Sequence, residues 1–400
     1  MTTRRATPAQ VREVVLAGML TMAVVMGIGR FAFTPILPAM RDAFGLSATD
    51  LGTLASANYL GYLLGALAAA TPAVLRWRRQ VMRGGLLLVV GVTAAMALTT
   101  SVPAWLVLRF VAGLASAGVF VFASAAVIGW FVQQSRPELV GFFFGGVGLG
   151  IASSGAMILL VQRLSGGPAW RAEWLGAALL GGLLAGPCLR WLPQETLSTA
   201  ARPRPGSDRR AISWPMLLLA VSYFLGGVGY IVAGTFIVAI VGAVPGLEAL
   251  GAGAWILVGL AAFPSTPVWT RVAARIGRMM TLGCSYLLLA LSLLLPGLIA
   301  QPAAAVIATL LFGANFIAFG ALTVAEAQAL APPQQAARTI ALLTVIFGLG
   351  QVAGPLLAAS LAGPGGDFRF SLVVAGLVVL GAALIALVSA FGPGRQGGRA

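Results

Sequence analysis

The first long apolar run of the chain contains the segment MAVVMGIGRFAFTPILPAM, Met22–Met40, in which Arg30 is the one charged residue. A charged side chain at the centre of a bilayer costs about 2.5–3.5 kcal/mol on insertion scales. Arg30 must therefore either reach water or lie in a protein-lined cavity that an anion can enter. The segment predicts a helix that crosses a membrane, with both explanations of Arg30 open at this point.

The composition extends this prediction to the whole chain. Hydrophobic residues make up 59% of the 400 residues and charged residues only 9%, whereas soluble domains carry about 25% charged residues. The 52 glycines suit close packing between transmembrane helices. The chain has no histidine, and its two cysteines, Cys188 and Cys284, lie in apolar runs. We therefore expect no metal site, no cofactor, no disulfide framework and no enzymatic activity.

Apolar runs long enough to cross a bilayer, about 20 residues each, occur along the entire sequence. The first run is longer than the core of a cleavable signal peptide, so we interpret it as a retained helix. The sequence predicts twelve membrane-spanning helices, at residues 14–38, 51–75, 84–101, 104–132, 140–162, 172–192, 214–243, 250–270, 279–299, 303–327, 338–361 and 370–391.

Arginine is distributed unevenly between the predicted connections. Nineteen arginines fall on the side of the N-terminus, four on the other side, and Arg30 and Arg109 inside predicted spans. Because positively charged connections stay in the cytoplasm, we expect both termini to be cytoplasmic and the protein to reside in the inner membrane. The net charge of +15 then reflects topology, and we expect no nucleic-acid partner.

The longest polar stretch, QETLSTAARPRPGSDRRA (Gln194–Ala211), separates the sixth predicted span from the seventh. Its prolines, glycine and arginines are typical of a linker. We expect an N-terminal six-helix bundle at 1–193, a cytoplasmic linker at 194–212 and a C-terminal six-helix bundle at 213–400.

The two predicted bundles resemble each other at an offset of 200 residues. GIGRF (Gly27–Phe31) corresponds to GVGYI (Gly227–Ile231), the GLG at Gly148–Gly150 returns at Gly348–Gly350, and Gly113 corresponds to Gly313. Two parallel six-helix repeats with a binding site between them are typical of secondary transporters.

Several motifs resemble those of the major facilitator superfamily, over roughly residues 11–391. Arginine-rich connections follow the second and eighth spans, RWRRQVMR (Arg76–Arg83) and RVAARIGR (Arg271–Arg278), although both lack the aspartate of the family motif. RFVAG (Arg109–Gly113) matches the R-x-x-x-G motif of span four. GGVGLGIASSG (Gly145–Gly155) resembles the span-five motif of antiporters without its proline. The G-x-G-R-F-x-x-T-P pattern at Gly27–Pro35 resembles a poorly characterised bacterial subgroup of the superfamily.

This resemblance implies twelve transmembrane helices in two pseudo-symmetric six-helix bundles, with spans one, four, seven and ten around a central cavity. It also implies that the basic connections latch the halves on the inside. The residues expected to take part in gating are Arg76, Arg79, Arg83, Arg271, Arg275, Arg278, Gly148, Gly150 and Gly155. For the glycines, close helix packing and a bend are the main interpretation.

Polar residues inside the spans are the candidates for substrate binding. At 1.5 Å per residue, Arg30 is roughly 12 Å from the outer end of its span, Asn58 roughly 11 Å and Arg109 roughly 8 Å. Three alternatives stay open: Arg109 can snorkel outward, Arg30 can be structural, and Asn58 can serve as an interhelical hydrogen-bonding residue. The candidate substrate-binding residues are Arg30, Asn58, Arg109, Tyr230, Asn315 and Gln351.

The ten acidic residues fall in connections or near span ends, so buried arginines without acids predict a positive cavity. Such a cavity favours an organic anion or polar metabolite, with arginine as a fork for a carboxylate. The function hypothesis is a secondary transporter that works by alternating access; the alternative is a proton-coupled efflux pump for amphipathic drug-like compounds. A sensor, an intramembrane enzyme and a channel are less consistent with the sequence. We expect a monomer that contacts membrane lipids and a small-molecule substrate, with protons as a candidate coupling ion.

Overall fold

The computed structural model describes residues 6–193, 213–247, 250–331 and 335–391. Within these ranges the chain is helical, and the only β-type pairing is an isolated bridge between Gly363 and Asp367. The helices of the N-terminal half are α1 (Pro8–Met22), a π-helical segment (Ala23–Ile28), α2 (Phe33–Phe44), α3 (Ala48–Ala69), α4 (Pro72–Leu75), α5 (Arg78–Ala95), α6 (Val102–Gln133), α7 (Val140–Ser165) and α8 (Trp170–Trp191). Those of the C-terminal half are α9 (Trp214–Gly242), α10 (Gly251–Ala262), α11 (Ser265–Ile276), α12 (Arg278–Leu298), α13 (Pro302–Asn315), α14 (Ala318–Leu330), α15 (Ala336–Ser360) and α16 (Arg369–Ala390).

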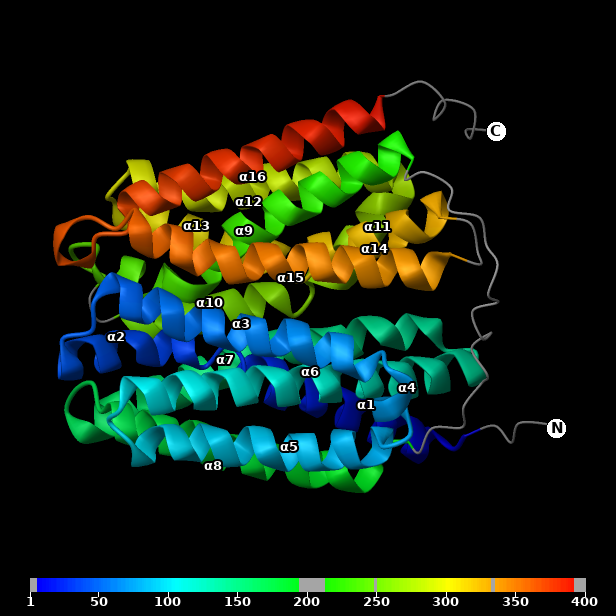
Figure 1. Cartoon of the computed structure of the whole chain (residues 1–400), viewed down its shortest axis with the longest axis horizontal. Coiled ribbons are helices and arrows are strands. Elements are labelled where there is room, and N and C mark those ends of the chain that lie inside the picture. Colours follow the sequence, from blue (N-terminus) through cyan, green and yellow to red (C-terminus); the bar gives the residue numbers. More distant parts are fainter. Residues whose placement is uncertain (1–5, 194–212, 248–249, 332–334, 392–400) are drawn as a thin grey trace.

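Length and composition identify ten membrane-crossing helices in the described residues, and the pair α10–α11, bent by 43°, makes eleven. The remaining predicted span is α3, which has 22 residues. It is less apolar because it carries Ser56, Asn58, Tyr59 and Tyr62, but it runs alongside the other long helices (Figure 1). The predicted spans therefore all correspond to helices, although the first runs from Pro8 to Phe44 rather than over 14–38.

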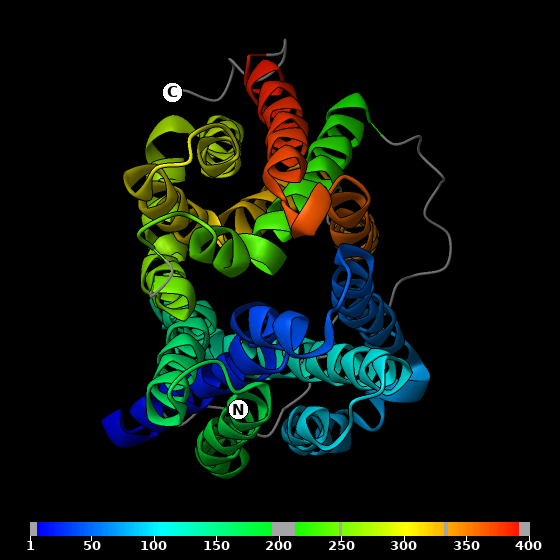
Figure 2. The same ribbon diagram turned by 90° about the vertical axis from the view of Figure 1, so that its left-hand side faces the viewer.

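The helices form two groups that meet along two pairs of helices. In Figure 2 the first half, coloured from blue through cyan to green, faces the second half, coloured from bright green through yellow and orange to red. The halves touch mainly where α3 packs against α15 and where α7 packs against α10. The predicted linker, 194–212, lies outside the described residues, so its boundaries stay a prediction.

Contacts of glycines reproduce the repeat that the sequence predicts. Gly150 on α7 lies against the backbone of Ala23, and its counterpart Gly350 on α15 lies against the carbonyl oxygen of Phe224 on α9. Likewise Gly113 on α6 touches the backbone of α3, and Gly313 on α13 touches the backbone of α10. Residues 200 positions apart thus pack against equivalent helices, so the two halves share one internal arrangement.

We call the end of the bundle at which α8 ends and α9 begins the linker end, which lies on the right in Figure 1. The first turn of α1, the short helix α4 and the start of α5 lie at this end, together with the last residues of α11 and α16. The arginine-rich connections Arg76–Arg83 and Arg271–Arg278 therefore gather at the linker end, as the sequence pattern predicts.

Candidate substrate site

The first span is interrupted at Arg30, and the interruption follows from the sequence. Pro35 has no backbone N–H, so the Phe31 carbonyl loses its usual helical donor and instead accepts a hydrogen bond from Thr34 N at 3.1 Å. The Arg30 carbonyl oxygen accepts a hydrogen bond from Arg109 Nη2 on α6 at 3.2 Å. A side chain of span four thus satisfies a backbone group in span one.

The turn before Arg30 is π-helical. Gly29 N donates to Val24 O at 2.8 Å and Phe31 N donates to Met26 O at 3.1 Å, which are bonds to the fifth preceding residue. Such wider turns are frequent at functional sites. Gly27 permits the turn to lie directly against the backbone of Gly150 on α7. The local sequence therefore holds Arg30 at a break in the helix rather than within a regular turn.

The Arg30 side chain crosses to the other half of the molecule and is only 3% exposed. Its Nη2 donates to Gln351 Oε1 on α15 at 2.7 Å, and its Cζ lies 4.0 Å from the ring centroid of Tyr62 and 5.0 Å from that of Tyr59. Its Nε has no hydrogen-bond partner among the residues that the structure describes. A full positive charge is therefore held by an amide oxygen and aromatic faces, with no carboxylate of the described residues bonded to it.

Arg109 lies beside Arg30 and points inward, with 2% of its surface exposed. Its guanidinium lies 4.6 Å from the ring centroid of Phe33, and its backbone carbonyl accepts a hydrogen bond from Asn58 Nδ2 at 2.9 Å. The structure thus brings together Arg30, Asn58 and Arg109, the three residues that the sequence places in one layer. In this arrangement Arg109 does not snorkel outward, and Asn58 makes an interhelical hydrogen bond.

Tyr230 on α9 belongs to an aromatic cluster next to Arg30. Its ring centroid lies 5.1 Å from that of Phe316 and 5.3 Å from that of Phe319. Phe316 in turn contacts Phe31, the residue after Arg30, with centroids 4.9 Å apart. The cluster gives the site a wall of rings from the C-terminal half.

Asn315 lies away from this group. Its Oδ1 accepts a hydrogen bond from Ser285 Oγ at 2.8 Å, and its Nδ2 donates to Leu311 O at 2.8 Å. Both bonds lie within the C-terminal half, and the first of them joins α12 to α13. The structure therefore unites Arg30, Arg109, Asn58, Gln351 and Tyr230 but does not bring Asn315 to them.

Side-chain hydrogen bonds join the two halves on one side of the Arg30 layer. Besides the Arg30–Gln351 bond, Thr34 Oγ1 donates to Gly234 O at 2.5 Å and Ser56 Oγ donates to Val352 O at 2.8 Å. Tyr59 Oη and Thr235 Oγ1 lie 3.3 Å apart. These bonds lie between the Arg30 layer and the end opposite the linker end, so the halves are held together there.

The two buried carboxylates of the described chain form their bonds elsewhere. Glu326 on α14 pairs with Arg278 at 2.9 Å, and Glu173 on α8 accepts from Gln162 Nε2 at 3.0 Å and from Ala169 N at 3.1 Å. In the described residues no group of acidic or cysteine side chains is placed to hold a metal ion. The described surroundings of Arg30 and Arg109 therefore lack a neutralising anion.

The glycines predicted to act in gating lie where helices approach closely. Gly148 and Gly155 on α7 face α10 of the other half: the ideal Cβ position of Gly148 lies 2.6 Å from Phe263 N, and that of Gly155 lies 3.0 Å from Ile256 N. Gly150 packs within its own half. Of the arginines in the gating set, Arg76 donates to Ala73 O in its own connection and Arg278 pairs with Glu326. Neither bond joins the halves.

The structure also places residues at the site that the sequence did not single out as ligands. Tyr59 and Tyr62 surround Arg30, and Thr34 and Thr235 bridge the halves. The sequence contained one signal for the hydrogen bond between Thr34 and Gly234, because these residues are 200 positions apart, which is the repeat offset. Equivalent positions that touch must lie near the pseudo-twofold axis.

Replacing Arg109 with methionine tests its role as the partner of the interrupted first span. Arg109→Met leaves the Arg30 carbonyl unpaired, and we expect a loss of about 1–3 kcal/mol in the free energy of unfolding. Adding Pro35→Ala supplies a backbone N–H for the Phe31 carbonyl oxygen, which frees Thr34 N to donate to the Arg30 carbonyl oxygen, so we expect part of the loss to be recovered. Thermal unfolding in detergent measures both effects; equal midpoints for wild type and Arg109→Met would show that this bond is dispensable.

The two helical halves, with a buried arginine site where they meet, define an MFS-type transporter. Residues 22–387 match the family described as "Uncharacterised MFS-type transporter YbfB", and the chain belongs to this family. The predicted major facilitator fold is therefore confirmed, and the protein is a multi-pass membrane protein of a transporter family.

Among the relatives with assigned roles are a resistance protein and a transporter, which are named for different compounds. The chain is 28% identical over 385 residues to a chloramphenicol resistance protein of Streptomyces lividans, covering 92% of this chain and 94% of that protein. It is 28% identical over 183 residues to the 4-hydroxybenzoate transporter PcaK of Pseudomonas putida, covering 46% of this chain and 40% of that protein. The match to PcaK thus spans less than half of its length.

Solved structures share the fold at low sequence identity. The nucleoside transporter NupG superimposes with a TM-score of 0.69 and 12% identity, covering 96% of this chain and 100% of the other. A bacterial homologue of the human lysosomal transporter Spinster, in an inward-facing and occupied conformation, gives a TM-score of 0.68 and 18% identity, covering 96% and 98%. These similarities establish the architecture alone.

Proposed function

We propose that this protein is a secondary transporter that moves a small organic anion across the bacterial inner membrane by alternating access. In this proposal Arg30 binds the anion between the two halves. The substrate class that fits the surrounding rings best is an aromatic carboxylate.

The observation that carries the proposal is the buried Arg30 guanidinium with an amide oxygen as its partner. Burying a charge is costly unless it is paired, and the Gln351 amide supplies a neutral acceptor. A carboxylate would form shorter and stronger charge-assisted hydrogen bonds with the same guanidinium, in a fork geometry. An anionic substrate can therefore replace Gln351 as the partner of Arg30 with a gain in stability.

The aromatic side chains support the narrower substrate class. Tyr59 and Tyr62 come from one half, and Tyr230 and Phe316 come from the other. Ring pairs in offset or edge-to-face arrangements add about 0.5–1.5 kcal/mol beyond area burial. The partial similarity to PcaK, a 4-hydroxybenzoate transporter, is in line with this class.

Exchange of the Arg30 partner would also link binding to movement. Gln351 belongs to the C-terminal half, so its bond to Arg30 helps to hold the halves together. With the termini in the cytoplasm, as the arginine distribution favours, the end at which side-chain hydrogen bonds join the two halves lies on the outer side of the membrane. The arrangement of the halves in this structure is then the inward-facing one. In the opposite state, the basic connections at the linker end would latch the halves by donating to helix-end carbonyls. We propose that the transporter acts as a monomer, with protons as the candidate coupling ion.

A second candidate function is efflux of amphipathic drug-like compounds. The similarity to a chloramphenicol resistance protein covers nearly the full length of both chains. The aromatic cluster around Tyr230 could also accept an uncharged ring. In this case Arg30 would be structural, and its bond to Gln351 would persist with substrate bound.

Thermal unfolding with matched ligands tests the two functions. The purified protein is heated with 4-hydroxybenzoate, with the corresponding neutral amide, or with chloramphenicol. A ligand at 100 times its Kd stabilises the folded state by about 2.7 kcal/mol, and we expect this shift for the carboxylate alone. Equal shifts for acid and amide would contradict charge recognition, and a shift with chloramphenicol alone would favour efflux.

A further inference from the structure

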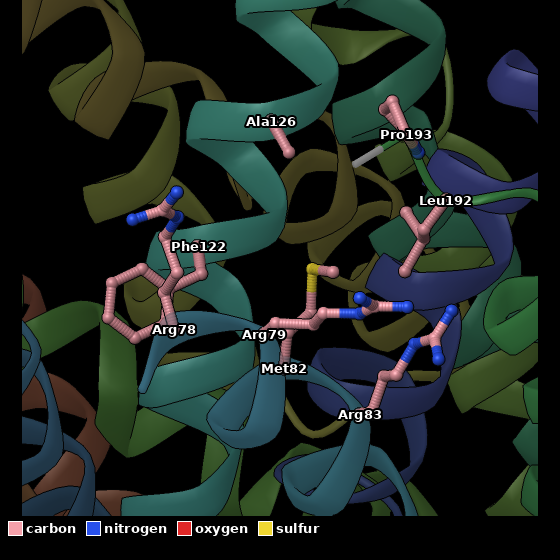
Figure 3. Close-up of a pocket in the computed structure, with 8 residues that line it drawn as sticks. All are labelled: Arg78, Arg79, Met82, Arg83, Phe122, Ala126, Leu192 and Pro193. Carbon is pink, nitrogen blue, oxygen red and sulfur yellow. The ribbon is translucent and has the colours of Figure 1, made fainter. Parts of the chain in front are cut away.

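A second basic site lies at the linker end of the N-terminal half, on the part of the bundle farthest from the C-terminal half. It is a pocket of about 220 Å³ between the start of α5, the second half of α6 and the residues that directly follow α8. Arg78, Arg79 and Arg83 lie along one side of it (Figure 3). The pocket is distinct from the Arg30 site, since the residues that line it are not those that surround that arginine.

Two of these arginines form a matched pair. Arg79 and Arg83 lie one turn apart on α5 and extend in the same direction, toward Leu192, whereas Arg78 turns the other way (Figure 3). In the described part of the chain no ion pair involves Arg79 or Arg83. Like charges four residues apart destabilise a helix, and the first turn of α5 contains no acidic residue. Among the described residues the pair therefore lacks a negative partner.

The other side of the pocket is apolar. Met82 from α5 and Phe122 and Ala126 from α6 are buried and form its floor, and Leu192 closes one side. A small soluble anion would bury no apolar surface against these side chains and would gain no binding free energy from them. An amphiphile, with a charged head and an apolar body, matches both sides at once.

The surface next to the pocket is suited to a lipid bilayer. Leu87 on α5 is 58% exposed and Leu183 on α8 is 67% exposed, so this outer face presents leucine outward. Trp77, directly before α5, is 53% exposed, and tryptophan is typical of the membrane–water interface. The exposed tryptophan and leucines favour a position for the pocket near the boundary between phospholipid headgroups and acyl chains.

We propose that this pocket binds an anionic phospholipid. Arg79 and Arg83 hold the phosphate by charge-assisted hydrogen bonds, and the glycerol backbone and the first part of an acyl chain lie on Met82, Phe122 and Ala126. Basic pockets between transmembrane helices on the cytoplasmic side are suited to such headgroups. In the arrangement of the halves seen here, the lipid holds two arginines of the predicted gating set.

Native mass spectrometry of the purified, delipidated full-length protein tests this proposal. Phosphatidylglycerol, phosphatidylcholine or sn-glycerol 1-phosphate is added to wild type and to Arg79→Gln/Arg83→Gln. Arg76→Gln is the matched control, because Arg76 belongs to the same connection but does not line the pocket. We expect a retained phosphatidylglycerol adduct in wild type and Arg76→Gln and at least a tenfold weaker adduct in the double variant.

Three results would overturn the proposal. Equal retention of phosphatidylcholine would show that headgroup charge is irrelevant, and equal binding of sn-glycerol 1-phosphate would assign the pocket to a soluble phosphate. An undiminished adduct in the double variant would place the lipid elsewhere. If the double variant does not fold, the single variants Arg79→Gln and Arg83→Gln give the same comparison, each with a several-fold loss expected.

Discussion

Replacing Arg30 with glutamine is expected to lower carboxylate uptake into proteoliposomes about 30-fold or more. Glutamine retains a hydrogen-bond donor but removes the charge, and loss of one partner of a buried charged pair costs about 2–5 kcal/mol. Each 1.4 kcal/mol corresponds to a factor of about ten in affinity. Because the partners of Arg30 in the structure, Gln351 and the Tyr62 ring, are neutral, we expect the folded state to tolerate the change. Uptake of radiolabelled substrate at low concentration measures the loss.

Two further variants separate charge from position. Arg30→Lys keeps the charge but not the planar fork, so we expect intermediate uptake. Arg163→Gln removes one positive charge from an exposed position at the end of α7 and is expected to transport normally. Full activity in Arg30→Gln, with normal expression, would assign Arg30 to structure and exclude it from anion binding.

Gly148→Val is expected to lower transport strongly, because it disrupts the contact between the two halves. A Cβ atom at this position would lie 2.6 Å from Phe263 N and 2.7 Å from Gly259 O, both backbone atoms of the other half. Overpacking costs about 1–3 kcal/mol where side chains can yield, and here the backbone can yield only if α7 and α10 separate. We therefore expect uptake to fall at least tenfold and the thermal midpoint to fall by several degrees.

Gly91→Val is the matched control for this experiment. Gly91 lies in the second half of α5, and its ideal Cβ position has no atom of another described helix within 4 Å. The same substitution should leave uptake and the thermal midpoint close to those of wild type. Equal behaviour of the two variants would mean that the α7–α10 contact is looser in the membrane than in this structure.

The fold could be predicted from sequence because its determinants are local or repetitive. The length of the apolar runs identifies the spans, and the arginines in the connections indicate which span ends lie on the same side of the membrane. The repeat offset relates the two halves to each other. Breaks within the spans could not be predicted in this way. The π-helical turn before Arg30, the bend between α10 and α11 and the break between α13 and α14 each fall inside a run that the sequence predicts as one continuous span.

The candidate site could be predicted only in part. Depth along the first, second and fourth spans brought Arg30, Asn58 and Arg109 into one layer, because helical rise is constant. The contact between Arg30 and Gln351 joins residues 321 positions apart and depends on how the halves pack, which no local pattern records. Asn315 is an amide residue inside a predicted span, as Gln351 is. Its side chain bonds to Ser285 on α12 instead, because tertiary packing sets the rotation of α13 about its axis.

The central claim is that Arg30 meets an anionic substrate, and solid-supported membrane recording tests it most directly. Wild-type and Arg30→Gln proteoliposomes are challenged with a panel of small carboxylates, including 4-hydroxybenzoate, and then with lipophilic cations. The account predicts substrate-induced currents with one or more carboxylates in wild type and none in Arg30→Gln. Currents with lipophilic cations alone, of equal size in both proteins, would contradict it and identify Arg30 as a structural residue of an efflux pump.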